Sequence, residues 1–120
     1  MVTRQETGKR GEREAEEFLN KRGLTTLERN WRCGHKEVDL IMDGVGAIHF
    51  VEVRALSAPS LLKPYETIGF NKQMNLIRAA SSYVAKHRVK KEVSFDIISV
   101  QFYEDHTVIE YFQNAFSPRW

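Results

Sequence analysis

The 120-residue sequence has one cysteine, Cys33, so an internal disulfide is excluded. A chain without disulfides is typical of a reducing compartment, and we expect a cytoplasmic protein. No apolar run approaches the roughly 18 residues of a membrane helix, and the charged N-terminal residues lack the apolar segment of a signal peptide. Neither sign of charge dominates, because the net charge is +2, which permits a polyanionic partner without requiring one.

The sequence does contain enough apolar residues for one folded core. Its hydrophobic fraction of 42% is ordinary for a globular protein, and 120 residues predict a single domain spanning residues 1–120. The predicted helices cover residues 4–22 and 72–87, and the predicted strands cover 24–32, the two arms of a hairpin within 37–54, then 95–102 and 108–112. This order predicts an α/β fold with a mixed central sheet flanked by helices.

Local signals predict where these elements begin and end. Thr3 and Glu6 have the spacing of a capping box before the first helix, and Gly23 is placed to end that helix. Asn71 is the expected cap of the second helix. Residues 55–68 contain two prolines and no periodicity, so they are predicted to form a loop.

The most informative stretch is the predicted hairpin from Glu37 to Arg54, with its turn at 43–46. Asp39 and Glu52 lie among apolar residues of its two strands, and carboxylates are rarely buried without a partner. A tight hairpin allows these two side chains to converge at one end of the sheet. Mg²⁺ commonly binds through one or two carboxylates and a substrate phosphate. Arg54 follows Glu52 on the same strand face and would point at the same substrate.

The other charged residues could contact nucleic acid or could simply be exposed to solvent. Arginines 29 and 32 flank Trp31, a combination that suits phosphate contact and base stacking but is equally compatible with a tryptophan packed in the core. The glutamates of the first helix are expected to form a solvated face. The cations that follow the second helix are expected to be a solvated terminus that complements the helix dipole.

The segment from Asp39 to Glu52-Val53-Arg54 resembles the Asp…Glu-x-Lys signature of restriction-endonuclease-like nucleases. The wider sequence is similar to the small bacterial YraN-type family of that superfamily. This wider similarity is carried by Gly8, Gly11, Glu12, Ala15, Phe18, Leu19 and Gly23, by residues 29–32, 37–41 and 50–54, by Lys72, Gln73 and 78–80, and by 95–96 and 114–116.

The resemblance implies a restriction-endonuclease-like core with a metal-dependent phosphodiesterase site. The implied ligands of Mg²⁺ or Mn²⁺ are Asp39 and Glu52, helped by the Val53 carbonyl. Glu12 takes the place of a helix glutamate of Holliday-junction resolvases, and Gln73 would approach from the second helix. The implied nucleic-acid contacts are Arg29, Trp31, Arg32 and Lys72.

Two positions depart from the family pattern. Lys36 stands where the family usually has glycine, and Arg54 stands where the signature has lysine. Arginine does not lose its proton in proteins, so Arg54 cannot act as a general base. It could still hold the scissile phosphate or stabilise developing charge.

Three functions follow as hypotheses. The first is a metal-dependent nuclease that acts on branched or otherwise structured DNA in repair or recombination, and analogy with junction-cleaving relatives adds a homodimer. The second is a nucleic-acid-binding module that keeps the fold and has lost cleavage. The third is a protein-interaction domain with no role on nucleic acid.

Overall fold

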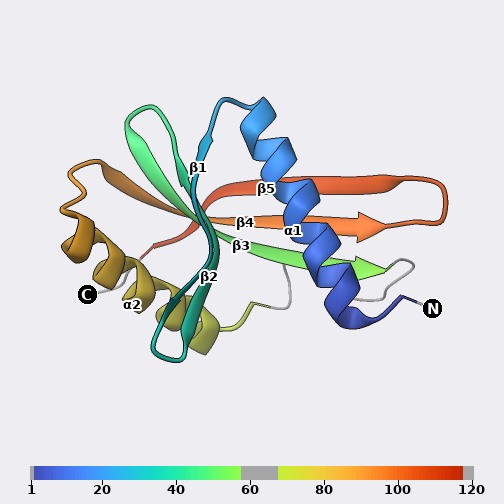
Figure 1. Cartoon of the computed structure of the whole chain (residues 1–120), viewed down its shortest axis with the longest axis horizontal. Coiled ribbons are helices and arrows are strands. Elements are labelled where there is room, and N and C mark those ends of the chain that lie inside the picture. Colours follow the sequence, from blue (N-terminus) through green and yellow to red (C-terminus); the bar gives the residue numbers. More distant parts are fainter. Residues whose placement is uncertain (1, 58–67, 118–120) are drawn as a thin grey trace.

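The chain folds into two helices and five strands in the predicted order (Figure 1). The computed structural model describes residues 2–57 and 68–117. The helices are α1 (Arg4–Lys21) and α2 (Phe70–His87). The strands are β1 (Thr25–Cys33), β2 (Lys36–Asp43), β3 (Ala47–Ser57), β4 (Glu92–Phe102) and β5 (Thr107–Phe116). Within the described residues, neither helix combines the length and apolarity needed to cross a membrane.

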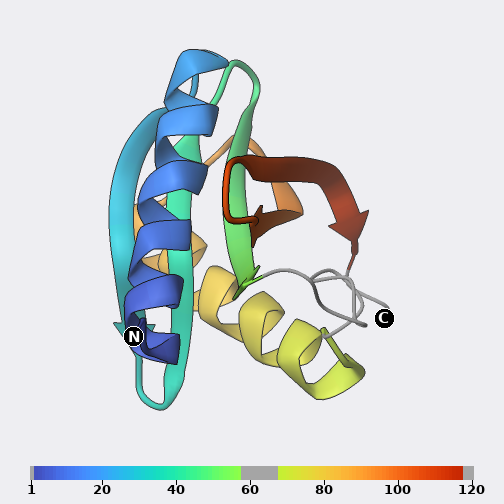
Figure 2. The same cartoon turned by 90° about the vertical axis from the view of Figure 1, so that its right-hand side faces the viewer.

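The five strands form one mixed sheet in the order β1-β2-β3-β4-β5, which confirms the predicted fold class. Strands β3 and β4 pair in parallel, and the other neighbours are antiparallel. Neighbouring residues of β3 face different apolar clusters: Phe50 belongs to the cluster under α2, and Val51 to the cluster under α1. The two helices therefore cover different sides of the sheet, with α1 standing beside the strands and α2 lying beneath them in Figure 2.

Helix α1 begins and ends as predicted. Its cap residue Thr3 accepts a hydrogen bond from the Glu6 N–H at 3.1 Å. At the other end Gly23 has φ +95°, and the Leu24 N–H donates to the Leu19 carbonyl, which satisfies a carbonyl that the helix leaves open. Between these ends α1 lies very close to β3, because a Cβ added at Gly11 would stand only 2.4 Å from the Ala55 Cβ.

Several predicted boundaries were wrong. Asn71 is not the cap of α2, since the helix begins at Phe70 and Gly69 occupies the cap position without a side-chain hydrogen bond. The predicted loop at 55–68 begins later, because residues 55–57 continue β3 in register with 100–102 of β4. Residues 58–67 of that predicted loop lie outside the described residues. Strands β4 and β5 are also longer than predicted, because pairing with their neighbours extends them.

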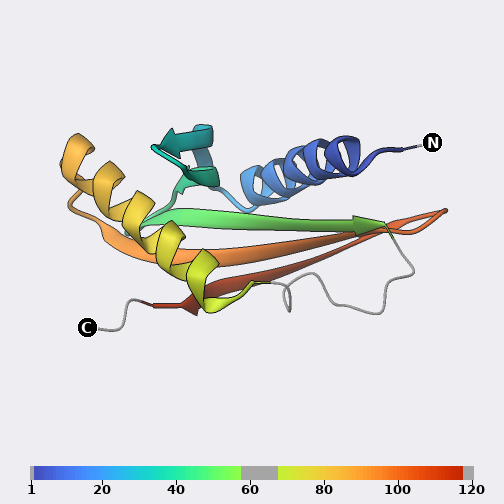
Figure 3. The same ribbon diagram turned by 90° about the horizontal axis from the view of Figure 1, so that it is seen from below.

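The sheet forks between β2 and β3. Pairing of β2 with β3 runs from Asp43↔Ile48 to Leu40↔Val51, whereas pairing of β2 with β1 continues to Lys36. Beyond Leu40 the β1–β2 hairpin therefore leaves the plane of β3–β5, and Figures 1 and 3 show it crossing the direction of those strands. A strand that leaves its neighbour exposes backbone groups, which side chains must then satisfy.

Candidate active site

Asp39 lies at the fork, one residue beyond the last β2–β3 pair. Its Oδ2 accepts a hydrogen bond from the Val53 N–H at 2.8 Å, so the carboxylate takes the place of a ladder carbonyl. If the β2–β3 register continued, Asp39 would stand opposite Glu52. The side chains of Asp39 and Glu52 therefore lie together, as the hairpin predicted, at the point where β2 and β3 stop pairing.

Glu52 is buried, with 2% of its surface exposed. Two cations approach the same oxygen, Oε2: Arg54 Nη1 at 3.5 Å from the same strand, and Lys72 Nζ at 3.6 Å from α2. The other oxygen, Oε1, is buried and has no hydrogen-bond partner among the residues that the structure describes. A buried oxygen without a partner carries a desolvation cost, which a bound ligand could remove.

The ionisation of Asp39 and that of Glu52 depend on each other. Burial raises the pKa of Asp39 well above its usual range, and the charges of Glu52 and Glu12 raise it further, against the Val53 hydrogen bond. Burial also raises the pKa of Glu52. The charges of Lys72 and Arg54 and the hydrogen bond with Asp39 lower it and offset the burial only in part. A bound divalent cation would favour the ionised form of both carboxyl groups.

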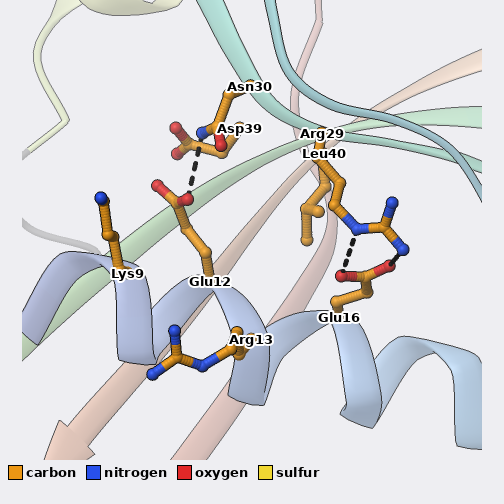
Figure 4. Close-up of a pocket in the computed structure, with 8 residues that line it drawn as sticks. All are labelled: Lys9, Glu12, Arg13, Glu16, Arg29, Asn30, Asp39 and Leu40. Carbon is orange, nitrogen blue, oxygen red and sulfur yellow. Dashed lines mark hydrogen bonds and ion pairs between the residues drawn. The ribbon is translucent and has the colours of Figure 1, made fainter.

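On the α1 side, Asp39 borders a pocket of about 200 Å³ between the helix and the β1–β2 hairpin. Figure 4 shows Glu12 rising from α1 toward Asn30 and Asp39. The Asn30 Nδ2 donates to Glu12 Oε1 at 3.0 Å. The remaining lining residues are Lys9, Arg13, Glu16, Arg29 and Leu40. The predicted helix glutamate therefore reaches the neighbourhood of Asp39, and Asn30 holds it there.

Asn30 was not among the predicted site residues. Its φ of +48° is left-handed in the middle of β1, between the pairs Arg29↔Leu40 and Trp31↔Val38. Backbone strain of this kind is common at functional sites, and asparagine tolerates it better than most residues. An asparagine inside an otherwise extended stretch was the one sequence signal that could have identified it.

The predicted nucleic-acid contacts have partners of their own. Arg29 pairs with Glu16 at 2.6 Å, and Arg32 lies 3.6 Å from Glu37. Trp31 takes the packed alternative, because its ring meets Tyr83 edge-on at 5.2 Å between centroids.

Helix α2 reaches the site through a different residue from the one expected. The Gln73 Nε2 donates to the Ile68 carbonyl at 3.4 Å, near the start of its own helix. The neighbouring Lys72 is the α2 side chain that extends to Glu52.

A buried aspartate, Asp96 on β4, shows how this fold holds a structural carboxylate. Ser94 Oγ and the Asn114 N–H donate to its Oδ1, His49 Nδ1 lies 2.7 Å from its Oδ2, and the Tyr111 hydroxyl donates to Oδ2 as well. Burial alone would raise the pKa of Asp96, but these hydrogen bonds outweigh it and lower that pKa. Asp39 and Glu52 have no comparable set of donors.

The acids at the fork do not form a complete protein cage for a metal. Within residues 2–57 and 68–117, no group of three or more His, Cys, Asp or Glu side chains is arranged to hold an ion. Mg²⁺ does not need such a cage, since it usually keeps several waters and binds through one or two carboxylates and substrate phosphates. Asp39 and Glu52 fit that kind of open site.

A model of the family described as "Uncharacterised protein family UPF0102" matches residues 11–100. The chain belongs to the UPF0102 family. A UPF0102 protein of Lawsonia intracellularis is 36% identical over 115 residues, which cover 92% of this chain and 85% of the relative. One from Dictyoglomus turgidum is 35% identical over 118 residues, 96% of this chain and all of the relative. The YraN-type family predicted from the motifs is thus confirmed.

The part matched by the UPF0102 model contains both halves of the fork. It includes Glu12 on α1, Asn30 and Asp39 on the hairpin, and Glu52 on β3, whereas β5 lies beyond its end. A UPF0102 relative from Persephonella marina is 40% identical over 94 residues, covering 78% of this chain and 81% of the relative. The family name assigns no chemistry, so the function must be argued from the site.

Proposed function

We propose that this UPF0102 protein is a metal-dependent endonuclease of restriction-endonuclease-like type that hydrolyses structured or branched DNA in repair or recombination. The observation that carries the proposal is the pair Asp39–Glu52. At the fork Glu52 is buried and Asp39 is half-buried, and the pKa of each is raised. One buried oxygen of Glu52 has no hydrogen-bond partner in the described part of the chain. A divalent cation between them would remove this electrostatic cost.

The donor set fits Mg²⁺ or Mn²⁺, with Asp39 and Glu52 as the residues that would hold the ion and the Val53 carbonyl as a predicted further ligand. When bound, such an ion lowers the pKa of a coordinated water and offsets negative charge on a phosphate. The chain orients these ligands itself. The Val53 N–H fixes the Asp39 carboxylate, and Asn30 holds Glu12 on the α1 side.

The positive side chains would bind the phosphate. Arg54 and Lys72 stand beside Glu52 on the α2 side, where charge-assisted hydrogen bonds to phosphate oxygens are available. Arg29 and Arg32 are paired with glutamates, so DNA would have to compete with those pairs. Their contribution to DNA affinity is therefore expected to be modest and to be detectable only at low salt concentration.

Two measurements test the proposal. Calorimetric titration with Mn²⁺ should show binding to the wild type and none to Asp39→Asn. The matched control is Asp43→Asn, which removes an exposed carboxylate of the same strand that pairs with Lys91 and should leave binding unchanged. Mn²⁺-dependent cleavage of a panel of branched, single-stranded and duplex DNA should disappear in Glu52→Ala. Equal Mn²⁺ binding by wild type and Asp39→Asn would refute the site.

The departure at Arg54 supports a second candidate, a nucleic-acid-binding module with a nuclease-like fold and no cleavage. Arginine stands where a lysine is usual, and it cannot accept a proton from water. This candidate predicts salt-dependent DNA binding without metal-dependent cleavage of any DNA in the panel. The homodimer belongs to the nuclease proposal, because symmetric cutting of two strands needs two sites, and sedimentation velocity would test it.

A further inference from the structure

We propose that Lys72 on α2 takes the role of the signature lysine. In the Asp…Glu-x-Lys signature this lysine follows two residues after the glutamate, where the present chain has Arg54 after Glu52. This inference rests on the proposed nuclease function. Lys72 Nζ lies 3.6 Å from Glu52 Oε2, and Arg54 Nη1 lies 3.5 Å from the same oxygen. Two cations from different elements thus converge on one carboxylate oxygen.

Helix stability does not explain a lysine at this place. Lys72 is in the first turn of α2, where the helix dipole disfavours positive charge. The turn has no acidic residue to compensate, and the cap residue Gly69 makes no side-chain hydrogen bond. A cation in this turn costs stability. Among the residues that the structure describes, the ion-pair partner of Lys72 is the buried Glu52. The position therefore points to a role at the site.

The two cations differ in what they can reach. The Lys72 side chain is 46% exposed, compared with 33% for Arg54 and 3% for Glu52. Lys72 thus extends from the buried acid to the solvent from which a DNA strand would arrive. The Lys72 ammonium is a compact charge on a flexible side chain. The Arg54 guanidinium is a planar group, and it lies on the strand that carries Glu52.

The role assigned to Lys72 is electrostatic. Its ammonium would contact a non-bridging oxygen of the scissile phosphate and stabilise the charge that develops there in the transition state. Arg54 would hold Glu52 in place and add a second contact to the phosphate. Lys72 is therefore a catalytic residue in this scheme, and its removal should lower kcat more than it raises KM.

The experiment compares five proteins in Mn²⁺ on the DNA that the wild type cleaves best: wild type, Lys72→Ala, Lys72→Arg, Lys86→Ala, and the double variant Lys72→Ala with Arg54→Lys. Lys86, in the last turn of the same helix, controls for the loss of one lysine. We expect Lys72→Ala to lower kcat by roughly 10²–10³-fold. Its melting temperature should stay close to that of the wild type, because removal of an unfavourable charge from the first turn opposes the loss of the ion pair with Glu52.

Rescue separates a role for charge from a role in folding. Lys72→Arg and the double variant should each recover at least about tenfold in kcat over Lys72→Ala. Lys72→Arg returns a cation at the α2 position, and the double variant replaces the Arg54 guanidinium with the ammonium of the signature lysine. The inference is overturned if Lys72→Ala keeps the kcat of Lys86→Ala, or if neither cation restores activity. In those cases an active wild type leaves the nuclease proposal standing. A wild type that cleaves no DNA refutes the nuclease proposal and this inference with it.

Discussion

Gly11 offers a direct test of how the position of α1 controls the site. A Cβ at this residue would stand 2.4 Å from the Ala55 Cβ, an atom fixed to the backbone of β3. Carbon atoms pack at about 3.5–4.0 Å, so Gly11→Ala must push helix and strand apart by about 1 Å. Gly8 is the matched control, because a Cβ added there meets nothing within 4 Å.

The expected magnitudes follow from two opposing effects. Alanine in place of glycine favours a helix by about 0.8–1.0 kcal/mol, so Gly8→Ala should raise the free energy of unfolding by about that amount. Gly11→Ala gains the same but also pays an overpacking cost of about 1–3 kcal/mol. The Gly11 variant should therefore be less stable than the Gly8 variant by about 1–3 kcal/mol.

Urea unfolding of the three metal-free proteins measures this difference. The shift should also reach the site, because Glu12 follows Gly11 and is held by Asn30 on the β1–β2 hairpin. Displacement by about 1 Å can cost as much as 10²-fold in activity, so Gly11→Ala should impair cleavage where Gly8→Ala does not. Equal stability of the two variants would show that α1 and β3 are not in the tight contact described above.

Three further predictions concern the strands. Asn30→Ala should be less stable than Asn30→Gly by on the order of 1 kcal/mol in urea unfolding, because only glycine adopts the left-handed φ of +48° freely; equal stabilities would contradict this. Ile97→Ala should cost about 2–5 kcal/mol, since this side chain is 8% exposed beside Glu52 in the sheet, and a loss under about 0.5 kcal/mol would contradict its burial. Without metal, the pKa of Asp39 is higher in the folded protein than its value of about 3.9 in the unfolded chain. The stability that Asp39 contributes is therefore fully present below this unfolded-state pKa and is lost as the pH rises through the folded-state pKa. The stability advantage of Asp39→Asn should therefore grow with pH by at most about 1.4 kcal/mol per unit, and a pH-independent difference would refute this.

The order of elements was predictable because each long element carries its own local signal. Three local signals mark the ends of elements: the capping residue Thr3, the terminal residue Gly23 and the turn at 43–46. All three lie where the sequence predicted them. The ends of β4 and β5 were not predictable in this way, because their length is set by pairing with neighbours that lie far away in sequence. The predicted start of α2 was wrong because its cap residue is a glycine, which makes no side-chain hydrogen bond and so gives no capping signal.

The choice between alternative partners also needed the structure. Trp31 could have been exposed or packed, and the decision came from Tyr83, 52 positions later on α2. Arg29 and Arg32 were expected to be available to nucleic acid, but Glu16 and Glu37 lie within reach of them. Which opposite charges meet depends on the relative placement of helix and hairpin, and sequence spacing does not report it.

The sequence could not distinguish the roles of Asp39 and Asp96. Val38-Asp39-Leu40-Ile41 and Phe95-Asp96-Ile97-Ile98 have the same pattern, an acid inside an apolar strand. Asp96 pairs with Val51 of β3 and lies at a bulge in the β4–β5 pairing, where four groups donate to or contact its carboxylate and lower its pKa. Asp39 lies where β2 leaves β3, so one backbone N–H reaches it, and the nearby charges of Glu52 and Glu12 help burial to raise its pKa. Asp96 is a structural anchor because its own hydrogen bonds satisfy it, whereas Asp39 at the fork has few donors. This difference is why we propose the chemistry at Asp39.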